Sequence, residues 1–75
     1  MLVGANVRAE LGRANRSQTW LGDRLGVTQA SVSLRLSGRI ALDITELVRI
    51  AEALNVPLSR LLDGVAVSQP IGAAS

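Results

Sequence analysis

The side chains available for chemistry in this chain are arginines, hydroxyls, amides and a few carboxylates. The sequence contains no cysteine and no histidine, and lysine is also absent. A hydroxyl nucleophile needs a base beside it, and histidine and lysine are the common ones, so we expect no enzymatic activity. The usual ligands of zinc are missing too, so we expect no metal, no cofactor and no small-molecule ligand. The remaining polar groups suit hydrogen bonding and the binding of anions.

The polar residues between 28 and 37 have a spacing that suits contact with DNA bases. At 100° per residue, Val32 and Leu36 share one face of a helix, and Ala30 and Leu34 lie almost opposite. The outward side therefore carries small polar and apolar groups and no acid, in the order Gln29, Ala30, Ser31, Ser33 and Leu34. Glutamine can bind adenine through two hydrogen bonds, serine can bond to several bases, and alanine or leucine can contact a thymine methyl. For Leu34 taken alone, an ordinary exposed apolar residue explains the sequence equally well.

Helical periodicity and helix-end signals predict five short helices that position these residues. Ser17, Thr28 and Asp43 suit N-caps, with Glu46 completing a capping box, and Asn15, Gly26, Gly38, Asn55 and Gly64 suit helix ends. The expected helices run from about 3 to 14, 17 to 25, 28 to 37, 43 to 54 and 57 to 64. The inward apolar residues include Ile40 and Leu42 in the linker before the fourth helix. The fold class is all-α.

The second and third helices have the spacing of a helix-turn-helix. Gly22 supplies a small residue where two helices cross steeply, and Gly26 supplies the positive φ that the turn requires. Val27 and Val32 then fill the space between the helices. In this arrangement the later helix projects from the body and can enter a major groove.

Charge is distributed unevenly along the 75 residues. Residues 1–39 hold six arginines and two acids, for a net charge of +4, whereas residues 40–75 have a net charge of −2. The imbalance favours one face made for a polyanion, although ordinary scatter of surface charge would give the same balance. No uncharged stretch reaches the ~18 apolar residues of a membrane span, and the first residues lack a secretion signal. We therefore expect a cytoplasmic protein, with one domain at 1–64 and a tail at 65–75.

Three stretches together resemble the lambda-repressor and Cro family of helix-turn-helix proteins, also called the xenobiotic-response-element type. They are SQTWLGDRLGVTQASVS at 17–33, RLSGR at 35–39 and ELVRIAEALNVPL at 46–58. The resemblance extends over about residues 5–63 and follows the family's order of five helices. The Arg-Leu-Ser-Gly ending is similar to versions found in GC-rich genomes and their phages. The resemblance implies a DNA-binding regulator.

The resemblance also implies roles for individual residues. The positions set against bases are Gln29, Ala30, Ser33 and Leu34. Gln18 would bond a phosphate and brace Gln29. The expected phosphate contacts are Gln18, Thr19, Thr28, Ser31, Ser37 and Arg39, to which electrostatics adds Arg13, Arg16 and Arg35. Arg24 is expected to pair with Asp23 or Asp43, or to remain a solvated charge.

Four positions depart from the family's pattern. Arg16 stands where many relatives have an apolar residue. Leu34 stands where many have a polar residue, which shifts the expected base preference towards thymine, and Leu36 stands where many have a glutamate and is expected to join the core. Gly22 replaces the commoner alanine, at a cost of about 1 kcal/mol in helix propensity. Trp20 is the sole aromatic residue, and it is expected to pack against the first helix rather than lie on the DNA backbone.

The function predicted from these observations is that of a Cro-like repressor, binding a near-palindromic operator as a homodimer. Two copies spaced one helical turn apart match operator symmetry and add affinity. The expected dimer surface is Pro57, Leu58, Leu61 and Leu62. The tail at 65–75 either joins this surface or is a disordered terminus. The alternative is a protein-binding module, such as the antitoxin of a toxin–antitoxin pair, because the fold alone does not decide function.

Overall fold

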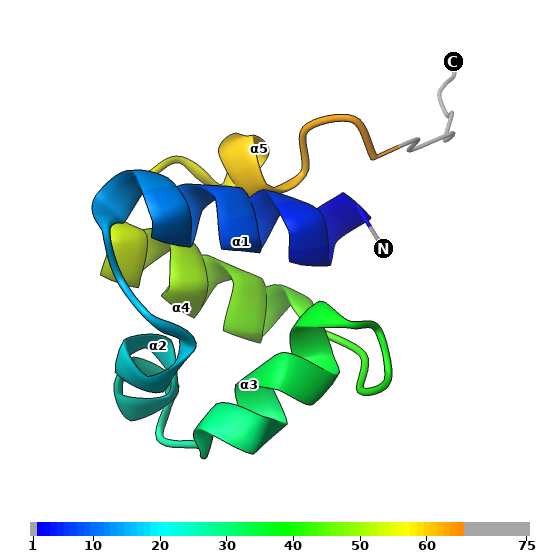
Figure 1. Ribbon diagram of the computed structural model, residues 1–75. Coiled ribbons are helices and arrows are strands. Elements are labelled where there is room, and N and C mark those ends of the chain that lie inside the picture. The colour runs from blue at the N-terminus through cyan, green and yellow to red at the C-terminus, as the bar shows by residue number, and fades with distance from the viewer. Residues whose placement is uncertain (1, 66–75) are drawn as a thin grey trace.

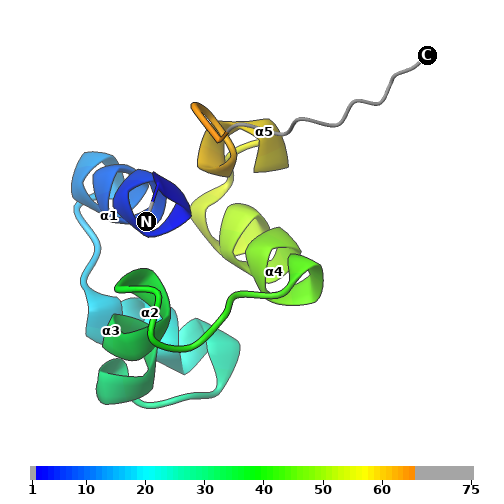
Figure 2. The ribbon, with the colours of Figure 1, turned by 90° about the vertical axis from the view of Figure 1, so that its right-hand side faces the viewer.

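The computed structural model describes residues 2–65, which form five helices and no strand. The helices are α1 (Leu2–Ala14), α2 (Gln18–Leu25), α3 (Gln29–Leu36), α4 (Ile44–Leu54) and α5 (Leu58–Leu61). Figures 1 and 2 show α5 at one end of the domain, α2 and α3 at the opposite end, and α1 with α4 between them. The predicted all-α fold of five helices is confirmed. All of the predicted tail except Val65 lies outside the described residues, and Val65 itself packs against the core.

The helix starts are fixed by the side chains that the sequence suggested. The Ser17 hydroxyl accepts the N–H of Trp20 at 3.0 Å, and the Thr28 hydroxyl accepts the N–H of Ser31 at 3.1 Å. Asp43 and Glu46 form a reciprocal capping box at the start of α4. These caps satisfy backbone N–H groups that have no partner within their own helix. The predicted caps are confirmed.

The helix ends also agree with the prediction, with one shift. Asn15 and Asn55 have φ values of 56° and 57°, in the left-handed region where asparagine is tolerated. Gly26 occupies the same region at the turn between α2 and α3, with φ 73°. Pro57 was expected in the first turn of the fifth helix, but it is the N-cap of α5, which is only four residues long.

The core lies between α1, α3 and α4, with α2 and α5 closing its two ends. Its most completely buried large side chains are Leu21, Leu36, Ile50, Leu61, Val7 and Val32. Leu36 therefore joins the core as predicted. The linker before α4 differs from the expectation: Leu42 packs against the core, but Ile40 is 37% exposed. The N–H groups of Arg39 and Ile40 both donate to the Leu34 carbonyl, which fixes the backbone there and leaves the Ile40 side chain outside.

Two close backbone approaches set how the helices cross. A Cβ on Gly22 would lie 2.7 Å from the carbonyl oxygen of Val27, so the turn into α3 passes too near for alanine. A Cβ on Gly4 would overlap the carbonyl of Leu36, where α1 crosses the end of α3. The need for a small residue at Gly22 was predicted from its place at the helix crossing. The need for one at Gly4 was not predicted, because the Leu36 carbonyl that it contacts is remote in sequence.

A buried carboxylate ties α1 to α5. Glu10 is 4% exposed and pairs with Arg13 and with Arg60, whose Nη1 lies 3.7 Å from the carboxylate. The Asn6 amide donates to the carbonyls of Leu61 and Asp63, at 2.9 and 2.7 Å, and so caps the end of α5. These polar contacts hold a helix that is too short to be stable alone. Among the described residues, no helix combines the length and apolar character needed to cross a membrane.

Candidate nucleic-acid interface

The outward side of α3 is open to solvent in the free protein. Gln29, Ala30 and Leu34 are exposed, and Ser33 is half-buried. The inward side is anchored by Val32 and Leu36, each 1% exposed. Burial of one side therefore aims the other away from the body, at the end of the domain opposite α5 (Figure 1).

Two glutamine side chains meet at the leading end of α3. Gln29 Nε2 donates to Gln18 Oε1 at 3.4 Å, near the long end of the hydrogen-bond range. Gln18 is the first residue of α2, and Gln29 is the first residue of α3. The predicted brace between these residues is therefore present. It restricts the amide of Gln29 before any ligand arrives.

The hydroxyl and arginine residues expected to meet phosphates flank both ends of α3. Thr28 caps its start, where exposed backbone N–H groups and the helix dipole favour an anion. Ser37 follows its end and donates its hydroxyl to the Leu34 carbonyl at 3.0 Å. Arg39 is exposed in the turn beyond, and Thr19 is exposed on α2. Thr28, Ser37 and Arg39 thus lie beside the two ends of α3 in the chain, Thr19 lies on α2, and their phosphate contacts stay predictions.

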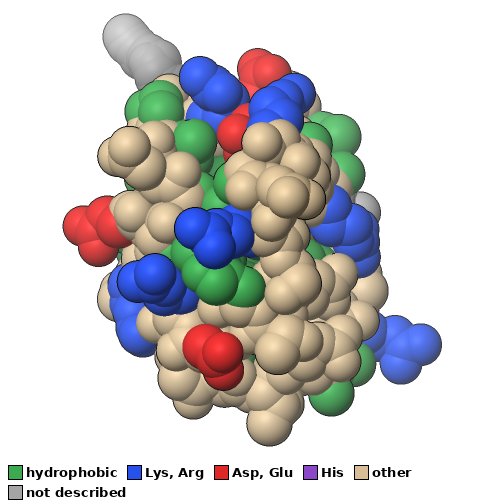
Figure 3. All heavy atoms as spheres, turned by 60° about the vertical axis from the view of Figure 1, so that its left-hand side comes forward, with side chains coloured by type: hydrophobic (Ala, Val, Ile, Leu, Met, Phe, Trp, Pro, Cys, Tyr) green, Lys and Arg blue, Asp and Glu red, His purple; other side chains and the backbone are tan. Residues whose placement is uncertain are grey.

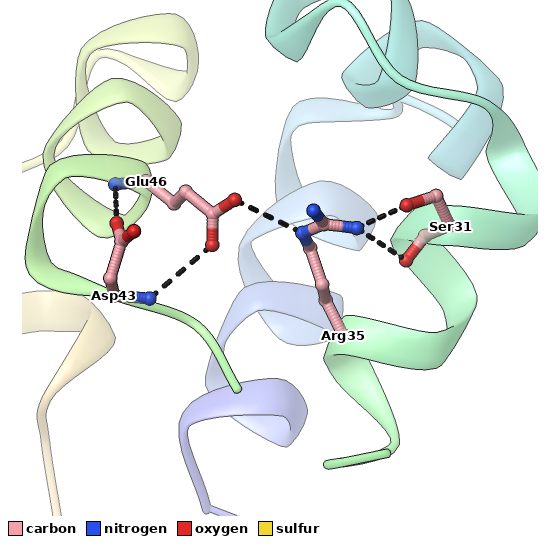
Figure 4. Close-up of polar contacts among 4 residues, drawn as sticks. All are labelled: Ser31, Arg35, Asp43 and Glu46. Atoms are coloured by element: carbon pink, nitrogen blue, oxygen red, sulfur yellow. Dashed lines mark hydrogen bonds and ion pairs between the residues drawn. The ribbon is translucent and has the colours of Figure 1, made fainter. Parts of the chain in front are cut away.

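Arg35 and Ser31, also predicted as phosphate contacts, are engaged inside the domain. Arg35 Nε donates to Glu46 Oε2 at 3.1 Å, and Arg35 Nη1 donates to the Ser31 hydroxyl and carbonyl (Figure 4). The Arg35 side chain is only 16% exposed. In the free protein a carboxylate from α4 therefore neutralises this guanidinium, and phosphate contact by Arg35 and by Ser31 stays a prediction.

Arg13 and Arg16 do not lie as free cations beside α3 either. Arg13 pairs with the buried Glu10, which also binds Arg60 of α5. Arg16 stacks on the Trp20 ring, with its guanidinium carbon 4.9 Å from the ring centroid. On the flank shown in Figure 3, basic side chains border a hydrophobic patch. Phosphate contact by Arg13 and by Arg16 stays a prediction. The contacts that these arginines make with Glu10 and Trp20 count against it.

Trp20 lies close to two arginines. It packs against the hydrophobic core, as predicted, and is half-buried. Arg24 was expected either to pair with Asp23 or Asp43 or to remain a solvated charge. No such ion pair occurs among the described residues, and Arg24 is exposed, with its guanidinium carbon 5.1 Å from the Trp20 centroid. A guanidinium near an aromatic ring is attracted by the negative face of the ring. Trp20 therefore attracts both arginines, which remain exposed to solvent.

The predicted dimer surface needs one correction. Pro57 is exposed, and Leu58 and Leu62 are half-buried against the core. Leu61 is 0% exposed, because it is the residue by which α5 enters the core of its own chain. It is therefore not available to a partner.

Two features of the structure have no local signal in the sequence. Ile44 and Val48 are 59% and 38% exposed on one face of α4, although both are apolar. The sequence predicts Glu46 as one half of a capping box, but it does not predict the contact between Glu46 and Arg35. The capping pattern is a local signal, whereas the Arg35 contact depends on how α3 crosses α4.

A family model described as helix-turn-helix matches residues 7–61, more than two-thirds of the chain. No curated protein and no solved structure matches. The matched range covers both helices of the motif, the turn between them and the helices that support them. The family resemblance expected from the sequence is therefore confirmed. The chain belongs to the helix-turn-helix family of lambda-repressor and Cro-like DNA-binding domains.

Proposed function

We propose that this protein is a sequence-specific transcriptional repressor of the Cro type that inserts α3 into the major groove of its operator. The observation that carries the proposal is the outward side of α3, which is exposed and free of acidic residues. An acid there would meet the negative potential of the groove and weaken close approach. Phosphate contacts from both ends of α3 then set its position, and base contacts from its outward side give specificity.

Each outward residue has a defined part in this proposal. Gln29, held by Gln18, reads adenine through its amide, while Ser33 bonds to a neighbouring base. Ala30 and Leu34 contact thymine methyl groups, so an operator half-site rich in A·T pairs near the centre of α3 is expected.

The repressor acts as a homodimer in this proposal. One α3 contacts only a few base pairs, so a single copy gives limited affinity and specificity. A two-fold pair places two α3 helices in successive major grooves, about 34 Å apart, and requires a near-palindromic operator. The surface proposed for pairing is formed by Pro57, Leu58 and Leu62.

Selection of bound oligonucleotides from a random pool tests the proposal. The expected outcome is an enriched sequence with two inverted half-sites separated by about one helical turn. A single enriched half-site would contradict the dimer. Failure to enrich any sequence, together with tight binding to a toxin-like partner, would support the antitoxin role instead.

A further inference from the structure

We propose that Glu46 is a positioning residue for base reading, and that it acts by holding Arg35 as an internal brace of α3. This inference rests on the proposed function, because it concerns how accurately α3 is aimed at bases. It assigns the half-buried Arg35 to a contact within the domain rather than to a DNA phosphate. It also gives Glu46 a role beyond the helix cap in which it takes part.

The capping box fixes the Glu46 carboxylate before Arg35 is considered. Glu46 Oε1 accepts the N–H of Asp43 at 3.3 Å, and Asp43 Oδ1 accepts the N–H of Glu46 at 2.8 Å. These reciprocal bonds limit the rotamers of Glu46 and leave Oε2 facing α3. Arg35 Nε donates to that oxygen at 3.1 Å (Figure 4). The start of α4 is therefore a fixed anchor for a side chain of α3.

The other end of the Arg35 guanidinium returns to its own helix. Nη1 donates to the carbonyl of Ser31 at 3.3 Å and to the Ser31 hydroxyl. One side chain thus joins the start of α4 to the preceding turn of α3. Arg35 and Glu46 are 16% and 24% exposed, so water and salt screen this pair less than an ion pair on the open surface.

The apolar anchors of α3 set which side faces outward, but they restrain small rotations of the helix about its own axis less than a directional bond does. Val32 and Leu36 hold the inward side, but hydrophobic burial is non-directional. Hydrogen bonds to base edges are directional and weaken steeply when the donor angle changes. The charged contact between Arg35 and Glu46 supplies a directional restraint from α4, one position along from the base-reading Leu34.

The two possible partners of Arg35 in the DNA complex, Glu46 or a phosphate, predict opposite effects of the same substitution. If Glu46 positions α3 through Arg35, removing the charge of Glu46 loosens α3 and weakens binding to the operator. If Arg35 instead dissociates from Glu46 and contacts a phosphate in the complex, removing the charge of Glu46 frees Arg35. Binding to every DNA sequence then becomes stronger. The variant Glu46→Gln separates the two, because glutamine keeps an oxygen for the N–H of Asp43 and so preserves the cap.

The experiment measures affinity for the selected operator and for random DNA at several salt concentrations. The variants are Glu46→Gln, Arg35→Met and the double substitution. Glu52→Gln is the matched control, because Glu52 is an exposed acid on the same helix with no ion pair among the described residues. Circular dichroism checks that each variant remains folded.

We expect each single variant to lose about tenfold in operator affinity, with little change on random DNA and an unchanged salt slope. The double variant should lose no more than either single one, because both remove the same contact. Glu52→Gln should change binding to both DNAs equally and only slightly. Restoring a cation with Arg35→Lys should recover part of the operator preference.

Two outcomes overturn the inference while leaving the proposed function intact. One is tighter binding by Glu46→Gln together with a salt slope reduced by about one unit in Arg35→Met, which marks a phosphate contact. The other is an operator preference unchanged in all variants. If the unaltered protein shows no operator preference, the proposed function itself fails, which is a separate and recognisable result.

Discussion

Gln18 and Gln29 come from different helices, yet their amides meet at the leading end of α3. A side chain already restricted in the free protein loses less conformational entropy when it binds. In this contact the Gln29 amide turns its nitrogen towards the Gln18 oxygen. The oxygen of Gln29 is then left to accept from the amino group of an adenine.

Gln29→Ala is expected to weaken binding to the selected operator by about 1–3 kcal/mol and to change binding to random DNA much less. The reason is that a base-edge contact carries sequence information, whereas phosphate contacts do not. Titrations on both DNAs measure the difference. Ser59→Ala, an exposed site on α5, is the control, and equal losses on the two DNAs would remove Gln29 from direct base reading.

Arg39→Ala is expected to weaken binding to all DNA sequences alike. Loss of one phosphate contact should reduce the slope of log affinity against log salt by roughly one unit. Arg60→Ala should leave the slope unchanged, because Arg60 lies on α5, at the far end of the domain from α3, and pairs with Glu10. Titration across a range of salt concentrations compares the two, and similar slopes for both variants would count against an Arg39–phosphate contact.

At the scale of elements, the crossing of α1 over the end of α3 depends on a backbone contact. Gly4 lets the carbonyl of Leu36 approach where any side chain would overlap it. The contact brings α1 close to the last turn of α3, so it contributes to the position of the outward side. Gly22 likewise lets the carbonyl of Val27 approach closely where the turn passes α2. Alanine at Gly22 would overlap Val27, which gives this glycine a packing reason that helix propensity alone does not supply.

Gly4→Ala is expected to lower the free energy of unfolding by about 1–3 kcal/mol, because overlap with backbone is relieved only by moving a helix. Gly12→Ala is the matched control on the same helix. Nothing lies within 4 Å of a Cβ at Gly12, so alanine there should raise stability by up to about 1 kcal/mol. Thermal or urea unfolding followed by Trp20 fluorescence measures both, and a stable Gly4→Ala variant would mean that α1 and α3 separate at little cost.

At the scale of the whole molecule, the domain has distinct ends. α3 and the residues that flank it lie at one end, and α5 lies at the other. The uneven charge of the sequence does not translate into a simple basic face, because Arg35 pairs with Glu46, and Arg13 and Arg60 share Glu10. Five exposed arginines have no ion pair among the described residues, namely Arg8, Arg16, Arg24, Arg39 and Arg49. We expect affinity for a polyanion to come mainly from these cations.

Pro57→Asp tests the proposed pairing surface without threatening the fold. Pro57 is exposed and is the N-cap of α5, a position where aspartate is favoured, so stability should be kept or slightly raised. Two like charges brought together across a two-fold axis should weaken the dimer. Sedimentation over a range of concentrations should then show more monomer than the unaltered protein. An unchanged dimer would move the interface elsewhere, and the exposed apolar face of Ile44 and Val48 is the next surface to test.

The helices and their ends were predictable from sequence because their signals are local. The Ser17, Thr28 and Asp43 caps act on N–H groups three residues away, and Asn15 and Asn55 end helices through their own backbone conformation. The outward side of α3 followed from the same periodicity, since burying Val32 and Leu36 turns Ala30 and Leu34 outward. Short-range sterics and hydrogen bonding decide all of these features.

Which charged groups lack an ion pair, and which apolar groups are exposed, depends on how the helices pack against one another. Arg35 meets a carboxylate 11 residues away, Glu10 meets Arg60 from the last helix, and Leu61 enters the core instead of lying on a surface. None of these contacts has a periodic or local pattern, because each depends on the angle and distance at which two helices cross. The sequence therefore determined the helices and the side of α3 that faces outward, and helix packing determined which arginines remain for DNA.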